Sequence, residues 1–105
     1  MPVVNVVAII TAKPGMRINV LEAFNANVPA VRAENGCIEY APTIDTKDVG
    51  PFQTKVGPNT FVVIEKWETL EHLMAHAEAP HMVAYGAKVK DMLANRVIHI
   101  LSSTS

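Results

Sequence analysis

The sequence lacks the features that form a disulfide within the chain, span a membrane or direct secretion. Its 105 residues include one cysteine, Cys37, so no disulfide can form within the chain, as is typical of a reducing compartment. No apolar run approaches the roughly 20 residues that a membrane-spanning helix needs. The first residues lack the basic segment and apolar stretch of a signal peptide. We therefore expect a cytoplasmic protein without a membrane partner.

The chain also lacks an excess of either charge. Nine Lys and Arg residues stand against ten Asp and Glu residues, which gives a net charge of -1. Because nucleic-acid binding depends on basic residues that neutralise phosphates, we expect no nucleic-acid partner. A Gly-rich phosphate loop, a dinucleotide fingerprint and a nucleophile elbow are absent as well. Any reaction would therefore need a substrate that supplies most of its own reactivity.

Apolar residues are what the chain has in abundance. Half of its residues are hydrophobic and 18% are charged, which is a high apolar fraction for a single domain covering residues 1–105. A domain of this size exposes much of its surface, so part of that apolar surface should be buried against a second copy. We therefore expect a homodimer.

The hydrophobic periodicity predicts the order strand-helix-strand twice. This order is typical of an α+β, ferredoxin-like split β-α-β fold, with a four-stranded antiparallel sheet and both helices on one face. The strands are too apolar to leave the other face in water, so two sheets should pack face to face. Proline should interrupt or bend both helices. The expected strands are 3–11, 37–44, 61–67 and 96–101. The expected helices are 16–34, with a kink or a break near Pro29, and 69–95, which Thr69 could cap and which restarts or bends at Pro80.

Three of the four histidines lie close together on the second predicted helix. At about 100° per residue, His76 flanks the apolar stripe of that helix, whereas His72 lies further round, toward solvent. His81, next to Pro80, could point at the mouth of a pocket. All three could instead be ordinary surface or boundary residues. No ligands complete a metal site around His72 and His76, so we predict none. The expected stripe is Leu70, Leu73, Met74 and Ala77.

Polar residues on three apolar strands are the other candidates. Glu65 shares a strand face with Phe61, Val63 and Trp67 by the period of two. If Glu65 is buried, its pKa should rise, and it could carry a proton or orient a histidine. Otherwise Glu65 pairs with Arg17, Arg32 or a lysine. Tyr40 and Asn5 could hydrogen-bond to substrate oxygens, and Tyr40 could equally be a core residue. Trp67 could be core or a wall of the site.

Several motifs resemble the antibiotic biosynthesis monooxygenase family, a dimeric α+β barrel group that includes quinol monooxygenases. The resemblance spans nearly the whole chain. Asn35 and Ala79 stand where the family typically has proline and serine, and the loop after Asp45 is longer. The motifs that carry the resemblance are Lys13-Pro14-Gly15, Glu34-Asn35-Gly36-Cys37-Ile38-Glu39-Tyr40, Glu65-Lys66-Trp67 and His76-Ala77-Glu78-Ala79-Pro80-His81.

The resemblance implies oxygenation of a quinol or polycyclic phenol by dioxygen, with neither a metal nor another cofactor. A base that titrates near neutral pH suits His76, with Glu65 or Tyr40 orienting it or the substrate. A small apolar or aromatic substrate would need a desolvated pocket. The residues expected to bind it are Trp67, Phe24, Met74, Met82, His81 and Asn5.

Two other functions stay open. An isomerase of the same fold could use the same histidine without oxygen, and a small-molecule binding module would have the pocket without turnover. The haem-degrading branch of similar fold is disfavoured, because Gly86 stands where that branch carries its axial histidine.

Overall fold

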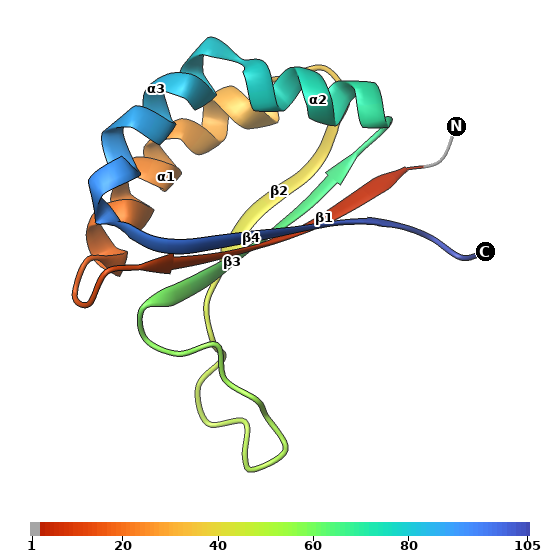
Figure 1. Ribbon diagram of the computed structural model, residues 1–105. Coiled ribbons are helices and arrows are strands. Elements are labelled where there is room, and N and C mark those ends of the chain that lie inside the picture. Colours follow the sequence, from red (N-terminus) through yellow and green to blue (C-terminus); the bar gives the residue numbers. More distant parts are fainter. Residues whose placement is uncertain (1–2) are drawn as a thin grey trace.

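The computed structural model describes residues 3–105 and shows one antiparallel sheet covered by helices on one face (Figure 1). The strands are ordered β2-β3-β1-β4, which confirms the predicted α+β, ferredoxin-like fold. The elements in chain order are β1 (Val4–Ala12), α1 (Arg17–Arg32), β2 (Cys37–Thr43), β3 (Thr60–Trp67), α2 (Leu70–Glu78), α3 (Pro80–Val89), the 3₁₀ turn η1 (Lys90–Met92) and β4 (Leu93–Ser102).

The core lies between α1 and the two central strands. Side chains of β1 and β3 alternate between buried and half-buried positions, as expected where helices cover only one face. Phe61 and Val63 of β3 pack there with Val20 and Phe24 of α1, and all four are at least nine-tenths buried. Burying such a side chain contributes about 1.5–3 kcal/mol. The half-buried residues on the other face have no covering layer within residues 3–105.

Pro29 does not interrupt the first helix, so of the predicted kink or break the structure excludes the break. Helix α1 runs through it and ends at Arg32. A proline in a helix leaves the carbonyl of the fourth residue before it without a donor. Here that residue is Asn25, which is exposed, so water can satisfy the carbonyl.

The predicted end of the last helix at Asn95 is also wrong. Helix α3 ends at Val89, and β4 already begins at Leu93. Leu93 lies opposite Ala12 at the end of β1, and the Lys13 amide donates to the Met92 carbonyl at 2.8 Å. Pairing with β1 therefore outweighs the local helical pattern in this segment. As an edge strand that the helices do not cover, β4 remains exposed along nearly its whole length.

The start of α2 and its division from α3 agree with the sequence. The Thr69 hydroxyl accepts from the His72 amide at 3.1 Å and so caps α2. Ala79 is extended, and Pro80 occupies the first turn of α3. No helix within residues 3–105 is both long and apolar enough to cross a membrane. Figure 1 shows the connection 44–59 extending away from the helices, and the Asp45 carboxylate holds it by accepting from the amides of Val56 and Gly57.

Candidate functional site

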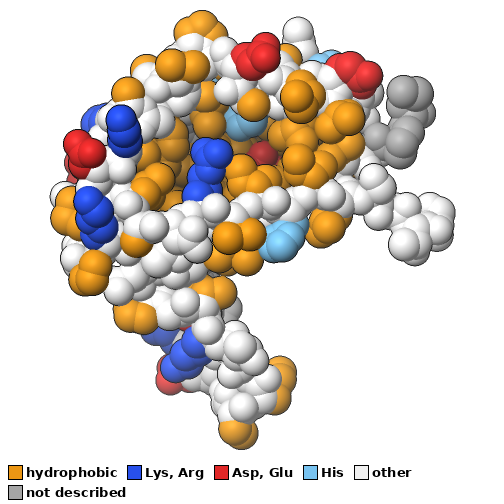
Figure 2. Space-filling model, viewed as in Figure 1, with side chains coloured by type: hydrophobic (Ala, Val, Ile, Leu, Met, Phe, Trp, Pro, Cys, Tyr) orange, Lys and Arg blue, Asp and Glu red, His pale blue; other side chains and the backbone are white. Residues whose placement is uncertain are grey.

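A cavity of about 510 Å³ lies between the helices and the uncovered end of the sheet. Its volume is in the range of small-molecule sites. Figure 2 shows it as a hollow beneath the helices with hydrophobic side chains over its floor. Strand β1 forms that floor with Val6, Ala8 and Ile10. Because β4 is the edge strand and no helix covers it, the cavity is open on that side.

His76 enters the wall of this cavity from α2. The residues that α2 buries are Leu73 and His76, whereas Leu70 and Met74 of the predicted stripe are 50% and 54% exposed. The stripe was therefore placed wrongly by about a quarter-turn. The cause is the uncovered β4: Met74 lines the open cavity, so it is not packed against a sheet.

Glu34 holds His76 in one orientation. The His76 Nδ1 atom lies 2.8 Å from Oε2 of Glu34 and donates to it, because a carboxylate only accepts. In the neutral ring, Nε2 then carries the lone pair. Among residues 3–105, Nε2 has no hydrogen-bond partner. His76 lines the cavity and Glu34 does not, so the Nε2 edge is the one left for a ligand.

His81 lies on the other side of the same carboxylate. Its Nε2 atom is 3.1 Å from Oε2 of Glu34, but the two groups are not aligned for a hydrogen bond, and neither ring nitrogen has a partner in the described part of the chain. The side chain does not line the cavity. The structure thus brings His76 and His81 together through Glu34 rather than at the mouth of the cavity.

Glu34 is the residue of this site to which the sequence reading assigned no role. Its only signal was its place in the segment from Glu34 to Tyr40 that resembles the family. The loop after α1 holds it near α2, because the Glu68 amide donates to the Gly36 carbonyl at 2.8 Å. Gly36 has a φ of +81°, and a Cβ atom there would overlap the His72 ring. His72 is therefore half-buried against this loop rather than free in solvent.

Aromatic rings enclose His76 on two sides. The Trp67 ring centroid is 4.7 Å from that of His76, and the Tyr40 centroid is 5.4 Å away. Trp67 is fully buried behind His76 and does not line the cavity. Tyr40 does line it, stacked on Phe24 at 5.3 Å. Burial raises the pKa of Tyr40 well above its ordinary value, so its hydroxyl stays protonated.

Glu65 is a buried carboxyl at the cavity floor. Desolvation raises the pKa of Glu65, while the hydrogen bond from Trp67 and the charge of His76 oppose the rise. The Trp67 Nε1 atom donates to Oε1 of Glu65 at 3.0 Å. No basic residue in the described part of the chain forms an ion pair with Glu65. The predicted alternative is excluded for Arg17 and Arg32, since both guanidinium groups hydrogen-bond to backbone carbonyls.

The remaining residues predicted to bind the substrate do not all reach the cavity. Phe24, Met74 and Met82 line the cavity. Asn5 does not, because successive strand residues point to opposite faces and its neighbour Val6 faces the cavity. In residues 3–105, no group of three or more His, Cys, Asp or Glu side chains could hold a metal ion.

Three further residues line the cavity near the start of β4: Tyr85, Lys90 and Arg96. None of the three has a predicted role in the site. The sequence pattern could not indicate one, because it predicts a helix over residues 90–95 and so misplaces the turn that brings α3 and β4 together.

Known proteins share both the sequence pattern and the fold. Residues 3–88 match the family model described as "Antibiotic biosynthesis monooxygenase". The chain is 42% identical over 98 residues to the Escherichia coli (strain K12) protein named "Probable quinol monooxygenase YgiN", covering 91% of this chain and 93% of that protein.

Two solved structures show the likeness in three dimensions. PA3566 from Pseudomonas aeruginosa superposes with a TM-score of 0.82 at 26% identity, covering 100% of this chain and 97% of that one. Rv0793 from Mycobacterium tuberculosis superposes with a TM-score of 0.79 at 22% identity, covering 98% and 96%. At 22% identity, the likeness to Rv0793 shows a shared fold alone.

Proposed function

Because the chain belongs to the antibiotic biosynthesis monooxygenase family, we propose that it is a monooxygenase that oxidises a quinol or polycyclic phenol with dioxygen and without a cofactor. The observation that carries this proposal is the Glu34–His76 pair in the wall of a largely apolar cavity. The name of the Escherichia coli relative supports a quinol as the substrate class.

The first step is removal of a proton from a substrate hydroxyl. His76 Nε2 accepts it, because Nδ1 already carries the hydrogen donated to Glu34. The ring becomes positively charged beside the Glu34 carboxylate, and a hydrogen bond to a charged group is stronger than one between neutral groups. A positioned base of this kind contributes about 10²–10⁴-fold to the rate.

The ionised substrate then reduces dioxygen itself. A ring carbon next to the ionised oxygen forms a bond to one oxygen atom, and the terminal oxygen takes up the proton held by His76. Loss of water then breaks the O–O bond and the C–H bond at that carbon and leaves a new carbonyl. One quinol and one dioxygen give one hydroxyquinone and one water, and all four electrons come from the substrate.

Tyr40 and Glu65 have supporting roles in this proposal. Tyr40 stays protonated and lines the cavity beside His76, so its hydroxyl can donate to the second substrate oxygen. Desolvation raises the pKa of Glu65, so its neutral form is favoured more than that of an exposed carboxyl, which lessens its repulsion toward a substrate anion. The apolar side chains around them, Phe24 and Met82 among them, exclude water and so strengthen these polar contacts.

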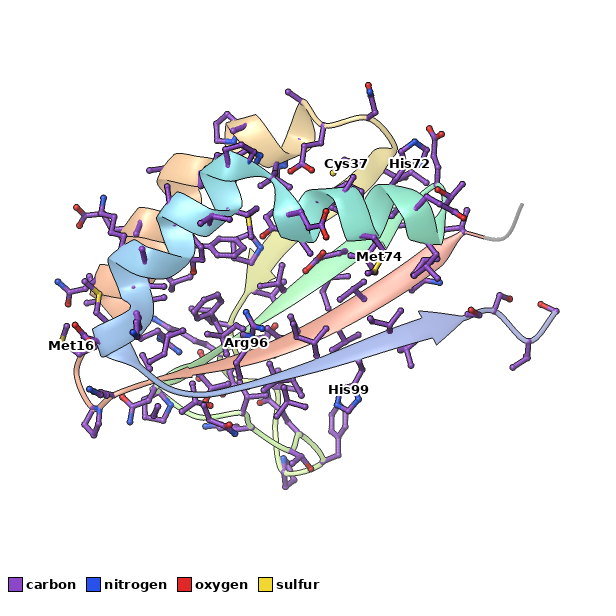
Figure 3. All side chains as sticks on the ribbon, turned by 45° about the horizontal axis from the view of Figure 1, so that its top comes forward. Met16, Cys37, His72, Met74, Arg96 and His99 are labelled. Carbon is purple, nitrogen blue, oxygen red and sulfur yellow. The ribbon has the colours of Figure 1, made fainter. Side chains whose placement is uncertain are left out.

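The same proposal includes a homodimer formed through the open face of the sheet. Val7 and Ile9 of β1, and Ile64 of β3, are half-buried on that face, and Leu101 of β4 is 47% exposed. Figure 3 shows His99 projecting on this face, away from the helices. A group of apolar side chains of this kind on one sheet face is typical of a surface that a partner covers.

Oxygen-electrode measurements with a panel of hydroquinones test the function, with heat-denatured protein as the control for spontaneous oxidation. We expect oxygen uptake, and one ¹⁸O atom per product molecule when ¹⁸O₂ is supplied. His76→Ala should lower turnover by at least about a hundredfold, while His72→Ala should leave the rate per folded molecule nearly unchanged. Equal rates for both variants would remove His76 from the mechanism.

Two other results would point to the alternative functions. Turnover that persists under anaerobic conditions would indicate an isomerase. Ligand-induced thermal stabilisation that survives His76→Ala, with no product by mass spectrometry, would indicate a binding module.

A further inference from the structure

Arg96 places a guanidinium group without a partner at the edge of an apolar cavity. It lies on β4 opposite Ile10, and both residues line the cavity. Figure 3 shows its side chain extending from β4 toward the helices, on the side opposite His99. Within residues 3–105, Arg96 forms neither an ion pair nor a side-chain hydrogen bond, although Arg17 and Arg32 are both engaged.

A second cation and a neutral donor lie at the same end. Lys90, directly after α3, also lines the cavity and is exposed. Tyr85 lines it from α3, and burial raises the pKa of Tyr85 to about 12, with the nearby charge of Arg96 opposing the rise. The Tyr85 hydroxyl therefore stays protonated. Glu65, the acidic side chain among the described lining residues, lies at the other end.

The strand register separates this basic end from His76. Glu65 lies opposite Val6 on β1, and Arg96 lies opposite Ile10. Four residues of a strand, at about 3.3 Å each, span roughly 13 Å. Between these ends the floor is apolar, formed by Val6, Ala8 and Ile10. An elongated aromatic molecule can therefore place one end at His76 and the other at Arg96.

We propose that Arg96, with Lys90 and Tyr85, forms an anion subsite that selects substrates carrying a carboxylate at the end remote from the oxidised hydroxyl. A guanidinium group matches a carboxylate with two parallel hydrogen bonds. An uncharged substrate that covered Arg96 would desolvate the cation without giving it a partner, which is unfavourable. The subsite deepens the proposed function, because it rests on the same cavity and names the class of substrate as an acidic quinol or phenol.

A pair of non-oxidising probes tests the subsite by calorimetry on the full-length chain. The probes are 6-hydroxy-2-naphthoate and its methyl ester, which differ in the charge at one end. Wild-type protein should bind the acid at least about tenfold more tightly than the ester, as a charge-assisted hydrogen bond would give, and this preference should fall as salt is added. Arg96→Gln should abolish the preference, because it weakens binding of the acid and removes the cation that the uncharged ester would have to desolvate.

Lys88→Gln is the matched control, since Lys88 is an exposed basic residue of α3 that does not line the cavity. It should keep the preference for the acid, and Arg96→Lys should keep part of it. Ester binding and circular dichroism show whether each variant is folded. Equal binding of the two probes to wild type, no binding of either, or an unchanged preference in Arg96→Gln would overturn the subsite.

Oxygen-uptake measurements distinguish failure of the subsite from failure of the proposed function. Uptake with neutral quinols but no preference for acids would remove the subsite and leave the monooxygenase. A preference for the acid without oxygen uptake for any quinol would support the subsite and remove the monooxygenase.

Discussion

Oε2 of Glu34 lies 2.8 Å from Nδ1 of His76, although 42 residues separate them in the chain. This contact sets which nitrogen of His76 can accept a proton. The same oxygen lies 3.1 Å from Nε2 of His81. One carboxylate oxygen therefore positions the candidate base and lies close to a second histidine.

Replacing Glu34 with glutamine should slow turnover without unfolding the protein. The amide can still accept from Nδ1, but it no longer stabilises the charged ring. Hydrogen bonds to charged groups contribute about 1.5–3 kcal/mol, which corresponds to roughly tenfold to hundredfold in rate. Oxygen uptake by Glu34→Gln should fall by this factor. Glu39→Gln, an exposed position on β2, is the control. A Glu34→Gln variant as fast as this control would contradict the role given to Glu34.

Gly36→Ala should destabilise the fold by two separable effects. The positive φ of +81° costs an alanine about 1–2 kcal/mol, and the new Cβ would overlap the His72 ring. In the double variant with His72→Ala, the stability lost through overlap with the ring should be recovered, whereas the stability lost through the positive φ should not. Urea unfolding of the two single variants and the double variant measures this coupling. Strictly additive losses would show that the ring and the loop do not meet.

Glu65→Gln should change how stability depends on pH. Burial raises the pKa of Glu65 in the folded protein, so the folded state prefers the protonated form. This contribution to stability is complete below the unfolded value of about 4.3 and is lost as the pH rises through the folded pKa. The wild-type free energy of unfolding should therefore fall, relative to Glu65→Gln, above about pH 4.3. Denaturation across pH 4–8 measures it, and parallel curves would contradict this account.

A lysine on the open face of the sheet should dissociate the proposed dimer. Ile64→Lys puts a charge at a half-buried position on that face. Ile18→Lys is the control, because Ile18 is 76% exposed on α1. Light scattering after gel filtration should give a dimer for wild type and Ile18→Lys, and a monomer or aggregate for Ile64→Lys. A folded wild-type monomer at micromolar concentration would exclude the interface.

The sequence by itself determined the fold class, the family and most of the elements. Period-two alternation on β3 put Phe61, Val63, Glu65 and Trp67 on one face, and the structure buries all four. Thr69 and Pro80 marked helix starts that the structure confirms. The quoted motifs identified the family, which the match over residues 3–88 confirms. These features depend on local chemistry, so they can be read along the chain.

Only the tertiary structure decided which side chains meet. Local pattern could not show that β1 pairs with residues from Leu93 onward, because that hydrogen bonding joins segments about 80 residues apart. Nor could it show that Glu34 reaches His76 or that Arg96 shares a cavity with Tyr85. These contacts depend on how α2, α3 and β4 pack around the sheet. Sequence spacing identifies the residues, whereas packing of distant segments brings them together.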